Sequence, residues 1–157
     1  MKSIVVYYSV SGQTKLVSEM ISKKLECDIL EITTKKEIPS DPLFRYLKGI
    51  KSILFKKENI LNEYNFNSNT YDRIILGFPN WASNCPPAMK EFIKENDFND
   101  KDIYLFTTYV ARGGDSCVRN VSKNFNHSQV KKMAKFSIPS KKSEKYINNI
   151  LDKFLEE

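Results

Sequence analysis

Polar turns separate short apolar runs along the whole chain, and strand-like and helix-like patterns alternate. Five segments are predicted as strands: Ile4–Tyr8, Cys27–Ile32, Arg73–Phe78, Ile103–Thr107 and Val130–Ile138. The first is apolar throughout, which is typical of a central parallel strand buried on both faces. The last carries three lysines among its apolar positions, which favours an edge strand. The alternation indicates an α/β fold with a parallel sheet.

Apolar residues also recur at helical spacing and predict five helices. Asp41 and Pro42 resemble an N-cap followed by proline at the first helical position. Residues 56–70 are Asn-rich and predict a polar or poorly ordered loop. The residues expected on the buried helix faces are, helix by helix, Leu16, Val17, Met20, Ile21 and Leu25; Leu43, Leu47, Ile50 and Leu54; Met89, Phe92 and Ile93; Cys117, Val118, Val121 and Phe125; and Ile147, Ile150, Leu151, Phe154 and Leu155.

Right-handed crossovers turn this order of elements into an open, doubly wound sheet. The length of 157 residues, with 41% hydrophobic and 28% charged residues, fits a single domain over residues 1–157. In such sheets ligands bind beyond the carboxyl ends of the strands. The turns after the first, third and fourth strands are therefore the candidate site.

No stretch approaches the roughly 20 apolar residues that a membrane helix needs. The N-terminal apolar run is too short for a secretory signal, so we expect a cytoplasmic protein without membrane contact. The three cysteines, Cys27, Cys85 and Cys117, form no CxxC pair and suit reduced thiols. One histidine, His127, is too few for a zinc site, and no metal is expected.

The formal net charge is +6 and the pI is about 9.1. The lysines are scattered along the chain, so nucleic acid is not expected as a partner. An anionic small ligand or an acidic partner fits this charge better.

The first candidate turn, Ser9–Thr14, joins a buried strand to a helix N-terminus. Three hydroxyls, backbone N–H groups and the positive end of the helix dipole converge there, and together they form a donor set for a phosphate. Gly12 lets the backbone approach the anion closely. The turn matches neither a P-loop nor a GxGxxG fingerprint, and an ordinary capping turn is the alternative.

The second turn, Gly77–Pro87, holds the only tryptophan, Trp81, in a polar loop bounded by prolines. A large aromatic side chain there stacks on a planar ring or plugs the end of the sheet, and we prefer stacking. The third turn, Thr107–Asp115, has two glycines and flanking hydroxyls that suit close packing against a ligand. Its Tyr109 is a second stacking candidate, and a flexible connection is the alternative.

Taken together, these turns resemble the flavodoxin family over nearly the whole chain. The family's phosphate loop is similar to Ser9–Thr14. Its strand-three signature, YD.IILG.P.W followed by P and F, is similar to Tyr71–Trp81 with Pro87 and Phe92. The resemblance implies a doubly wound three-layer sandwich, with a five-stranded parallel sheet of order 2-1-3-4-5. It also implies non-covalently bound flavin mononucleotide (FMN).

The resemblance further implies which residues bind the cofactor, and none of them is catalytic because the flavin does the chemistry. By this resemblance, the FMN phosphate is expected to bind to Ser9, Ser11, Gly12, Gln13 and Thr14. The isoalloxazine ring falls on Pro79, Asn80, Trp81, Ala82 and Ser83, and on Thr107, Thr108, Tyr109, Gly113 and Gly114.

The chain departs from the family pattern in its charge. Familiar electron-carrying flavodoxins are acidic, whereas this chain is basic, which changes the expected partners. Its flavin loops hold no carboxylate apart from Asp115, and Arg112 lies nearby. A cation beside the flavin favours the anionic reduced form, so we expect a less negative hydroquinone potential than in low-potential carriers.

A phosphorylation-receiver domain shares the strand order but needs an aspartate at the end of the third strand. The chain has Gly77-Phe78-Pro79 there, so this class is disfavoured.

Three functions fit the pattern, and the preferred one is an electron carrier. A small NAD(P)H-dependent, quinone reductase-like oxidoreductase needs an anchor for the nicotinamide nucleotide, which the basic surface fits weakly. A flavin-less binding module is the third.

The expected partner is a redox protein or NAD(P)H, and we expect a monomer or a homodimer. The segment Leu43–Phe55 is a candidate for covering the sheet, capping the flavin or contacting a second copy.

Two cysteines lie in or beside the flavin loops. Cys117 falls in the first turn of a helix, a position that can lower the pKa of a thiol. We prefer a packing role for both Cys85 and Cys117.

Overall fold

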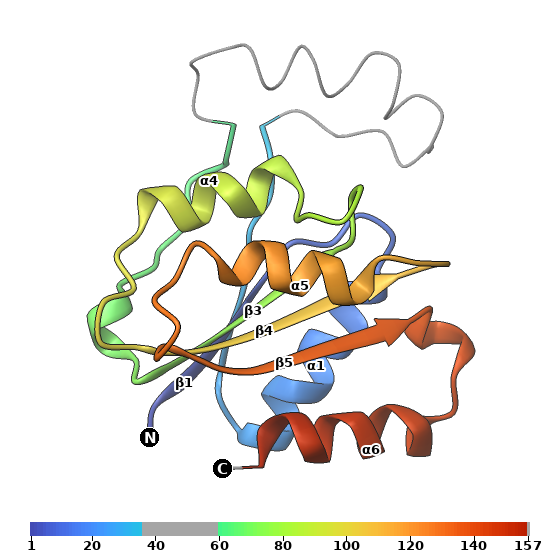
Figure 1. The fold of residues 1–157 in the computed structure, drawn as a ribbon. Helices are drawn as coiled ribbons and strands as arrows, with labels where there is room; N and C mark the ends of the chain where they lie inside the picture. Colours follow the sequence, from blue (N-terminus) through green and yellow to red (C-terminus); the bar gives the residue numbers. More distant parts are fainter. Residues whose placement is uncertain (36–59, 157) are drawn as a thin grey trace.

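The computed structural model describes residues 1–35 and 60–156, which form a three-layer α/β sandwich (Figure 1). Five parallel strands make one sheet in the order β2-β1-β3-β4-β5, which confirms the predicted topology. The strand bounds are β1 Ser3–Tyr7, β2 Asp28–Glu31, β3 Arg73–Pro79, β4 Asp102–Tyr109 and β5 Val130–Ser137.

Helices cover both faces of this sheet, α1 and α6 on one side and α4 and α5 on the other (Figure 1). Four predicted helices are confirmed, and the one expected over Leu43–Leu54 lies outside the described residues. The bounds are α1 Gln13–Leu25, α4 Pro87–Glu95, α5 Gly114–Ser122 and α6 Glu144–Leu155, with short 3-10 helices η2 Ser68–Thr70 and η3 Pro139–Lys141.

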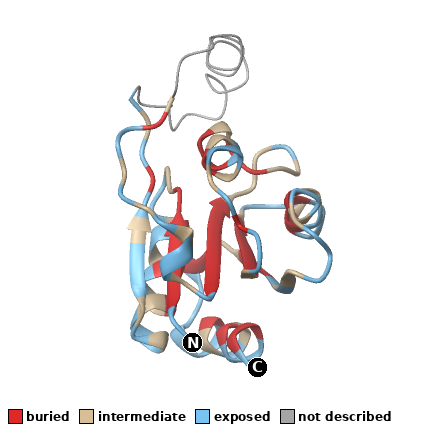
Figure 2. Ribbon diagram, turned by 90° about the vertical axis from the view of Figure 1, so that its left-hand side faces the viewer, coloured by how far each residue is buried: buried red, intermediate tan, exposed pale blue. Residues whose placement is uncertain are grey.

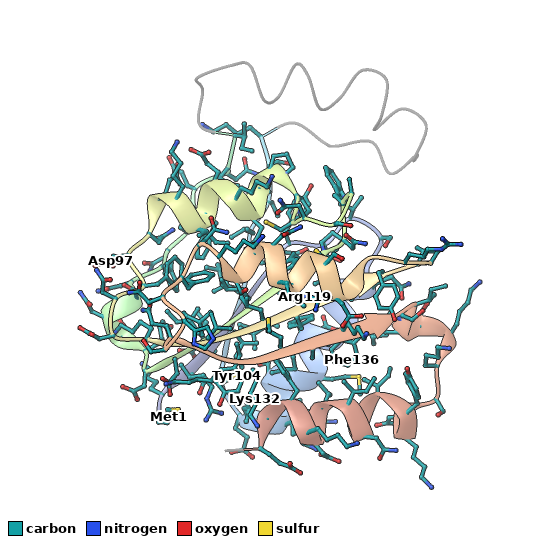
Figure 3. The ribbon with its side chains drawn as sticks, in the orientation of Figure 1. Met1, Asp97, Tyr104, Arg119, Lys132 and Phe136 are labelled. Carbon is teal, nitrogen blue, oxygen red and sulfur yellow. The ribbon has the colours of Figure 1, made fainter. Side chains whose placement is uncertain are left out.

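The central strands are buried on both faces, as their apolar runs predicted (Figure 2). Successive side chains of β3 alternate between the layers: Ile74 and Leu76 pack toward α4 and α5, and Ile75 packs toward α1 and α6. Figure 3 shows Tyr104 and Phe136 in the layer between the sheet and α6.

Helices α1 and α6 are joined to each other as well as to the sheet. Val17 and Ile21 of α1 share one buried cluster with Ile147 and Leu151 of α6. At the far end of α1, a Lys24–Asp152 ion pair links the same two helices.

Gly77 is the point of closest packing inside the sheet. It lies opposite Phe106 in the β3–β4 register, and a Cβ atom at Gly77 would stand 2.2 Å from Cζ of that ring. Phe106 is itself fully buried, and its ring makes edge contacts with Phe136 and Phe154. A side chain at position 77 therefore has no room unless the core moves.

The structure corrects the expected pattern most clearly at β4 and in the loop before β3, and it shifts the ends of the other strands by a single residue. β4 is longer than predicted, because Thr108 and Tyr109 continue the pairing with β5. The loop expected over residues 56–70 is well packed where it is described: Leu61 is 1% exposed, and the rings of Tyr64 and Phe66 lie 5.3 and 5.0 Å from that of Phe92. The polar composition of the segment had hidden these apolar contacts.

Candidate functional site

Three loops meet at the carboxyl edge of the sheet, as the topology requires for strands that run in parallel. Two direct contacts join them. The hydroxyls of Thr14 and Thr108 lie 2.9 Å apart in a buried position, and the Asn80 side-chain amide donates to the Arg112 carbonyl at 2.8 Å. The first contact links the first turn of α1, directly after the β1–α1 loop, to the end of β4, and the second links the β3–α4 loop to the β4–α5 loop. The predicted site residues therefore converge in space.

The β1–α1 loop has the form of an anion site. Gly12, the N-cap residue of α1, takes the left-handed conformation, with φ at 78°. Because glycine has no side chain, no N-cap hydroxyl or carboxylate occupies the start of the helix. Ser9 Oγ accepts a hydrogen bond from the Lys15 N–H at 3.3 Å, which turns this hydroxyl toward the start of the helix. An added Cβ at Gly12 would meet nothing within 4 Å, so the space beside the loop is open. Exposed Ser11 stands next to this space.

Trp81 begins a tight turn over residues 81–84, which we call the Trp81 turn. Its backbone exchanges hydrogen bonds with Asn84 at 2.8 and 3.0 Å, and Ala82 and Ser83 both have positive φ, at 48° and 62°. Two left-handed central residues define a type I′ turn, which normally uses glycine or asparagine. An alanine in this left-handed conformation is under backbone strain. Such strain is common at ligand-binding loops. The Trp81 side chain is half-buried against the core.

The β4–α5 loop is packed tightly against the Trp81 turn. A Cβ at Gly113, where φ is 88°, would stand 2.9 Å from Asn80 Nδ2 and 3.1 Å from Ser83 Oγ. Asn120 of α5 also donates to the Ser83 carbonyl at 2.9 Å. Glycine is thus required at position 113 for both conformation and space.

The threonines and the tyrosine at the end of β4 are already engaged within the protein. Thr107 is fully buried and donates to the Phe78 carbonyl at 2.9 Å, so its hydroxyl faces the core. The Tyr109 ring packs on Gly114, where an added Cβ would stand 2.9 Å from Tyr109 Cδ1. Cofactor contacts by these residues stay a prediction.

The electrostatics of the edge are dominated by cations. A hydrogen bond from Lys135 lowers the pKa of the Asp115 carboxyl, and this carboxylate raises the pKa of Lys135 in turn. Both side chains are exposed at the surface. The negative charge of Asp115, in the first turn of α5, is therefore balanced by Lys135, whereas Arg112 forms no ion pair within residues 1–35 and 60–156.

A contact that the sequence analysis missed joins the phosphate loop to η3. The Gln13 amide donates to Ser140 Oγ at 2.8 Å, and its Oε1 accepts from the Ser140 N–H at 3.0 Å. We call this pair the Gln13–Ser140 clasp. Gln13 was predicted as a phosphate contact, but both ends of its side-chain amide are hydrogen-bonded to Ser140. Only the backbone N–H of Gln13 is therefore left for an anion. No local signal marks Ser140, because 127 residues separate the partners.

Burial gives the thiols of Cys85 and Cys117 higher pKa values than their positions in the sequence suggest. Cys85 and Cys117 lie in the core beneath the Trp81 turn, and burial raises their pKa values to about 12 and about 11. A lowered pKa for Cys117 at the helix start is wrong, because desolvation outweighs the dipole. The packing role is consistent with this environment.

Thiol reactivity follows from how accessible each thiol is, because burial raises the pKa of Cys27 as well and only Cys85 and Cys117 are fully inside the core. At pH 8 we expect a disulfide reagent such as DTNB to modify only half-buried Cys27 in the native protein, and all three cysteines after denaturation. Cys27→Ser should abolish the native reaction, and rapid labelling of this variant would contradict the assignment.

The pKa values of Cys85 and Cys117 also predict how stability depends on pH, because both lie above the ordinary value of 9.0. The contribution of these two thiols to the free energy of unfolding is complete below pH 9 and is lost as the pH rises through about 11 and about 12.

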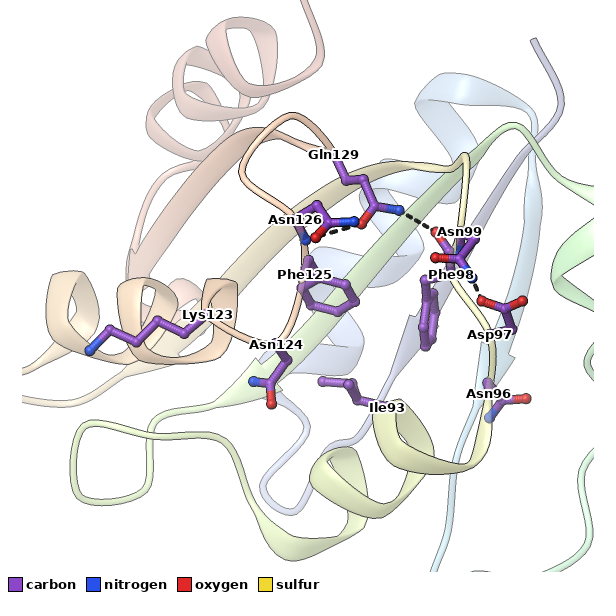
Figure 4. Close-up of a pocket in the computed structure, with 10 residues that line it drawn as sticks. All are labelled: Ile93, Asn96, Asp97, Phe98, Asn99, Lys123, Asn124, Phe125, Asn126 and Gln129. Atoms are coloured by element: carbon purple, nitrogen blue, oxygen red, sulfur yellow. Dashed lines mark hydrogen bonds between the residues drawn. The ribbon is translucent and has the colours of Figure 1, made fainter.

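A cavity of about 350 Å³ lies at the opposite, amino edge of the sheet, between the α4–β4 and α5–β5 loops (Figure 4). Its polar groups are largely used within the protein: Gln129 donates to the Phe98 carbonyl and accepts from the Asn126 N–H. It is distant from the three loops and is not the predicted site. The lining residues are Ile93, Asn96, Asp97, Phe98, Asn99, Lys123, Asn124, Phe125, Asn126 and Gln129.

The described residues offer neither a cluster of metal ligands nor a helix suited to a membrane. No group of three or more His, Cys, Asp or Glu side chains there is placed to hold a metal ion. No helix in the described part of the chain has the length and apolar character to cross a membrane.

A parallel sheet of order 2-1-3-4-5, with a phosphate-type loop after β1, defines a doubly wound α/β protein whose ligand edge lies at the switch between β1 and β3. The flavodoxin family model matches residues 2–152, so the chain belongs to the flavodoxin family.

Solved structures share this fold at low sequence identity. A flavoprotein of Lactobacillus acidophilus, solved in complex with FMN, gives a TM-score of 0.77 at 19% identity, with 99% of each chain covered. A proposed flavoprotein of Bacteroides eggerthii gives 0.76 at 20% identity, again with 99% of each chain covered. Another from Bacteroides uniformis gives 0.77 at 20% identity, over 96% of this chain and 97% of that one. No curated protein matched the sequence.

Proposed function

We propose that this protein binds FMN non-covalently at the carboxyl edge and works in the cytoplasm as an electron carrier. The observation that carries the proposal is the anion site at the start of α1. There the N-cap side chain is absent, two serines are close by, and the space beside Gly12 is open. The FMN held by the L. acidophilus flavoprotein, which has the same fold, supports the choice of ligand.

The chain's own residues would bind and orient the cofactor. Ser9, Ser11 and the first N–H groups of α1 would bind the phosphate, with the helix dipole favouring its charge. Trp81 and the β4–α5 loop around Gly113 would hold the ring and exclude water. When bound, FMN supplies the one- and two-electron redox chemistry, and the protein sets its potential.

The first experiment is a titration of the apoprotein with FMN, followed by visible absorbance. We expect saturable binding at micromolar concentrations with a perturbed flavin spectrum. Trp81→Ala should weaken binding about fivefold to tenfold through lost aromatic stacking. Trp81→Phe is the matched control and should stay within about threefold of the native protein, since it keeps an aromatic face. Absence of saturable binding by the native protein would refute the proposal.

The second candidate is an NAD(P)H-dependent oxidoreductase. It is favoured by the exposed cations Arg112, Lys141 and Lys142 at the carboxyl edge, which suit nucleotide phosphates. Rapid NADPH oxidation by the FMN-loaded protein would select this function. A stable blue one-electron state of the flavin would select the carrier.

Arg112 is expected to tune the cofactor's potential. Its positive charge favours the anionic reduced flavin, so Arg112→Ala should shift the hydroquinone potential downward, whereas Arg112→Lys should retain most of the native value. Redox titration with a reference dye measures both. An unchanged potential in Arg112→Ala would show that the guanidinium does not act on the ring.

A further inference from the structure

Three cations at the carboxyl edge stay uncompensated. Arg112 lies in the β4–α5 loop, Lys141 ends η3 and Lys142 follows it, and all three are exposed. None of them forms an ion pair within the described ranges 1–35 and 60–156. We call these three residues the basic rim.

Acidic residues close to the rim do not cancel its charge. Asp115 is bound by Lys135. Glu144 lies in the first turn of α6, where the positive end of the helix dipole faces it. The rim therefore presents a net positive surface beside the cofactor loops.

Hydrogen bonds fix the lysines of the rim next to the phosphate loop. The Gln13–Ser140 clasp holds η3 against the start of α1. The Ile138 N–H donates to the Tyr109 carbonyl at 3.0 Å, which holds the same segment against the end of β4. β5 ends on the same side of the molecule as the β4–α5 loop, at the right of Figure 1. Lys141 and Lys142 thus border the cofactor edge rather than a remote face.

Apolar side chains are exposed among these cations. Val110, which directly follows Tyr109, is 77% exposed, and Tyr146 is 45% exposed. Lys142 Nζ lies 5.5 Å from the centroid of the Tyr146 ring, which orients this lysine without neutralising it. Tyrosine and arginine beside an exposed aliphatic residue are a composition typical of protein interfaces.

From these observations we propose that the basic rim, with Val110 and Tyr146, is the docking surface for an acidic redox protein. The inference rests on the proposed function, because it is useful only if an electron leaves the flavin at this edge. Charge attraction across such a small surface speeds encounter more than it tightens the complex. The partner, with an oxidised redox centre, would accept one electron from the reduced cofactor held at this edge, and no atom would be exchanged.

The test compares two haem proteins as electron acceptors, acidic cytochrome b5 and basic mitochondrial cytochrome c. The FMN-loaded protein is photoreduced and mixed with each in a stopped-flow instrument. We expect the rate constant for cytochrome b5 to fall at least about fivefold as salt rises from about 10 to about 200 mM, since the Debye length shrinks. The rate for cytochrome c should rise or stay constant.

A matched pair of variants separates the rim from the overall charge. Lys141→Glu/Lys142→Glu should slow reduction of cytochrome b5 about tenfold at low salt. Lys23→Glu/Lys153→Glu makes the same charge change in the last turns of α1 and α6, at the other edge of the sheet, and should slow it less than about twofold. Circular dichroism checks that both variants fold. Equal losses in the two variants, or faster reduction of cytochrome c at low salt, would overturn the proposal.

A second readout does not depend on flavin. Carbodiimide cross-linking to cytochrome b5, with or without FMN, should join its carboxylates to Lys141 or Lys142, as mapped by mass spectrometry. Cross-links confined to Lys23 and Lys153 would overturn the docking surface. Failure to bind FMN, in contrast, would refute the proposed function, and cross-linking alone would then decide where an acidic protein docks.

Discussion

Replacing Gly77 by alanine is expected to destabilise the protein by about 2–3 kcal/mol, near the upper end of the usual cost of overpacking. The new Cβ would stand 2.2 Å from the Phe106 ring. That ring cannot rotate away freely, because Phe136 and Phe154 contact it and Phe106 itself is fully buried. Urea unfolding, read as a lower midpoint at an unchanged slope, measures the loss.

A second-site variant shows whether crowding is the cause. Phe106→Leu alone should be destabilising because it leaves a cavity. In the Gly77→Ala background, however, it should recover part of the lost stability, since the smaller side chain makes room. The coupling free energy from the double-mutant cycle is therefore expected to be favourable and above about 1 kcal/mol. Additive losses would mean that Gly77 is needed for its backbone alone.

The second large effect is expected at the phosphate loop. Ser11→Glu should weaken FMN binding about 100-fold, because a carboxylate close to the phosphate adds like-charge repulsion and removes a hydroxyl donor. Ser11 is exposed and lies outside α1, so the apoprotein should keep its unfolding midpoint. Isothermal titration of the apoprotein with FMN measures the change.

Riboflavin is the matched control ligand, because it has the same ring and no phosphate. Ser11→Glu should alter riboflavin affinity by less than about threefold, whereas Trp81→Ala should weaken both ligands to a similar extent. An equal loss for FMN and riboflavin in Ser11→Glu would place the phosphate elsewhere and would remove the main support for the proposed cofactor site.

The fold was predictable because its strongest signals are local. Apolar runs such as Ile4–Tyr8 and the helical spacing of α1 and α6 were enough, with the crossover rule, to yield a parallel sheet and its ligand edge. The convergence of the three loops followed from that topology. The strand bounds were less accurate, because the ends of β4 depend on pairing with β5 rather than on β4 itself.

Other features depend on contacts between distant residues and left no local pattern. The Gln13–Ser140 clasp gives one side chain a different role from the one its position suggested. The raised pKa of Cys117 follows from burial, which a helix-start position does not reveal. Leu61 is a core residue inside a polar segment, and half-buried Tyr64 and Phe66 pack against the same core, so composition averaged over that segment concealed them.

The pairing of α1 with α6 has a consequence for how the protein is made. Helix α1 begins directly after the β1–α1 loop, yet the partners that support its two ends, Ser140 and Asp152, are translated more than a hundred residues later. A nascent chain that has not yet released residues 138–155 from the ribosome lacks both contacts and a third of the buried cluster that α1 shares with α6. We therefore expect cofactor loading to be a late event in synthesis, and premature termination before η3 should yield a chain that cannot retain the nucleotide.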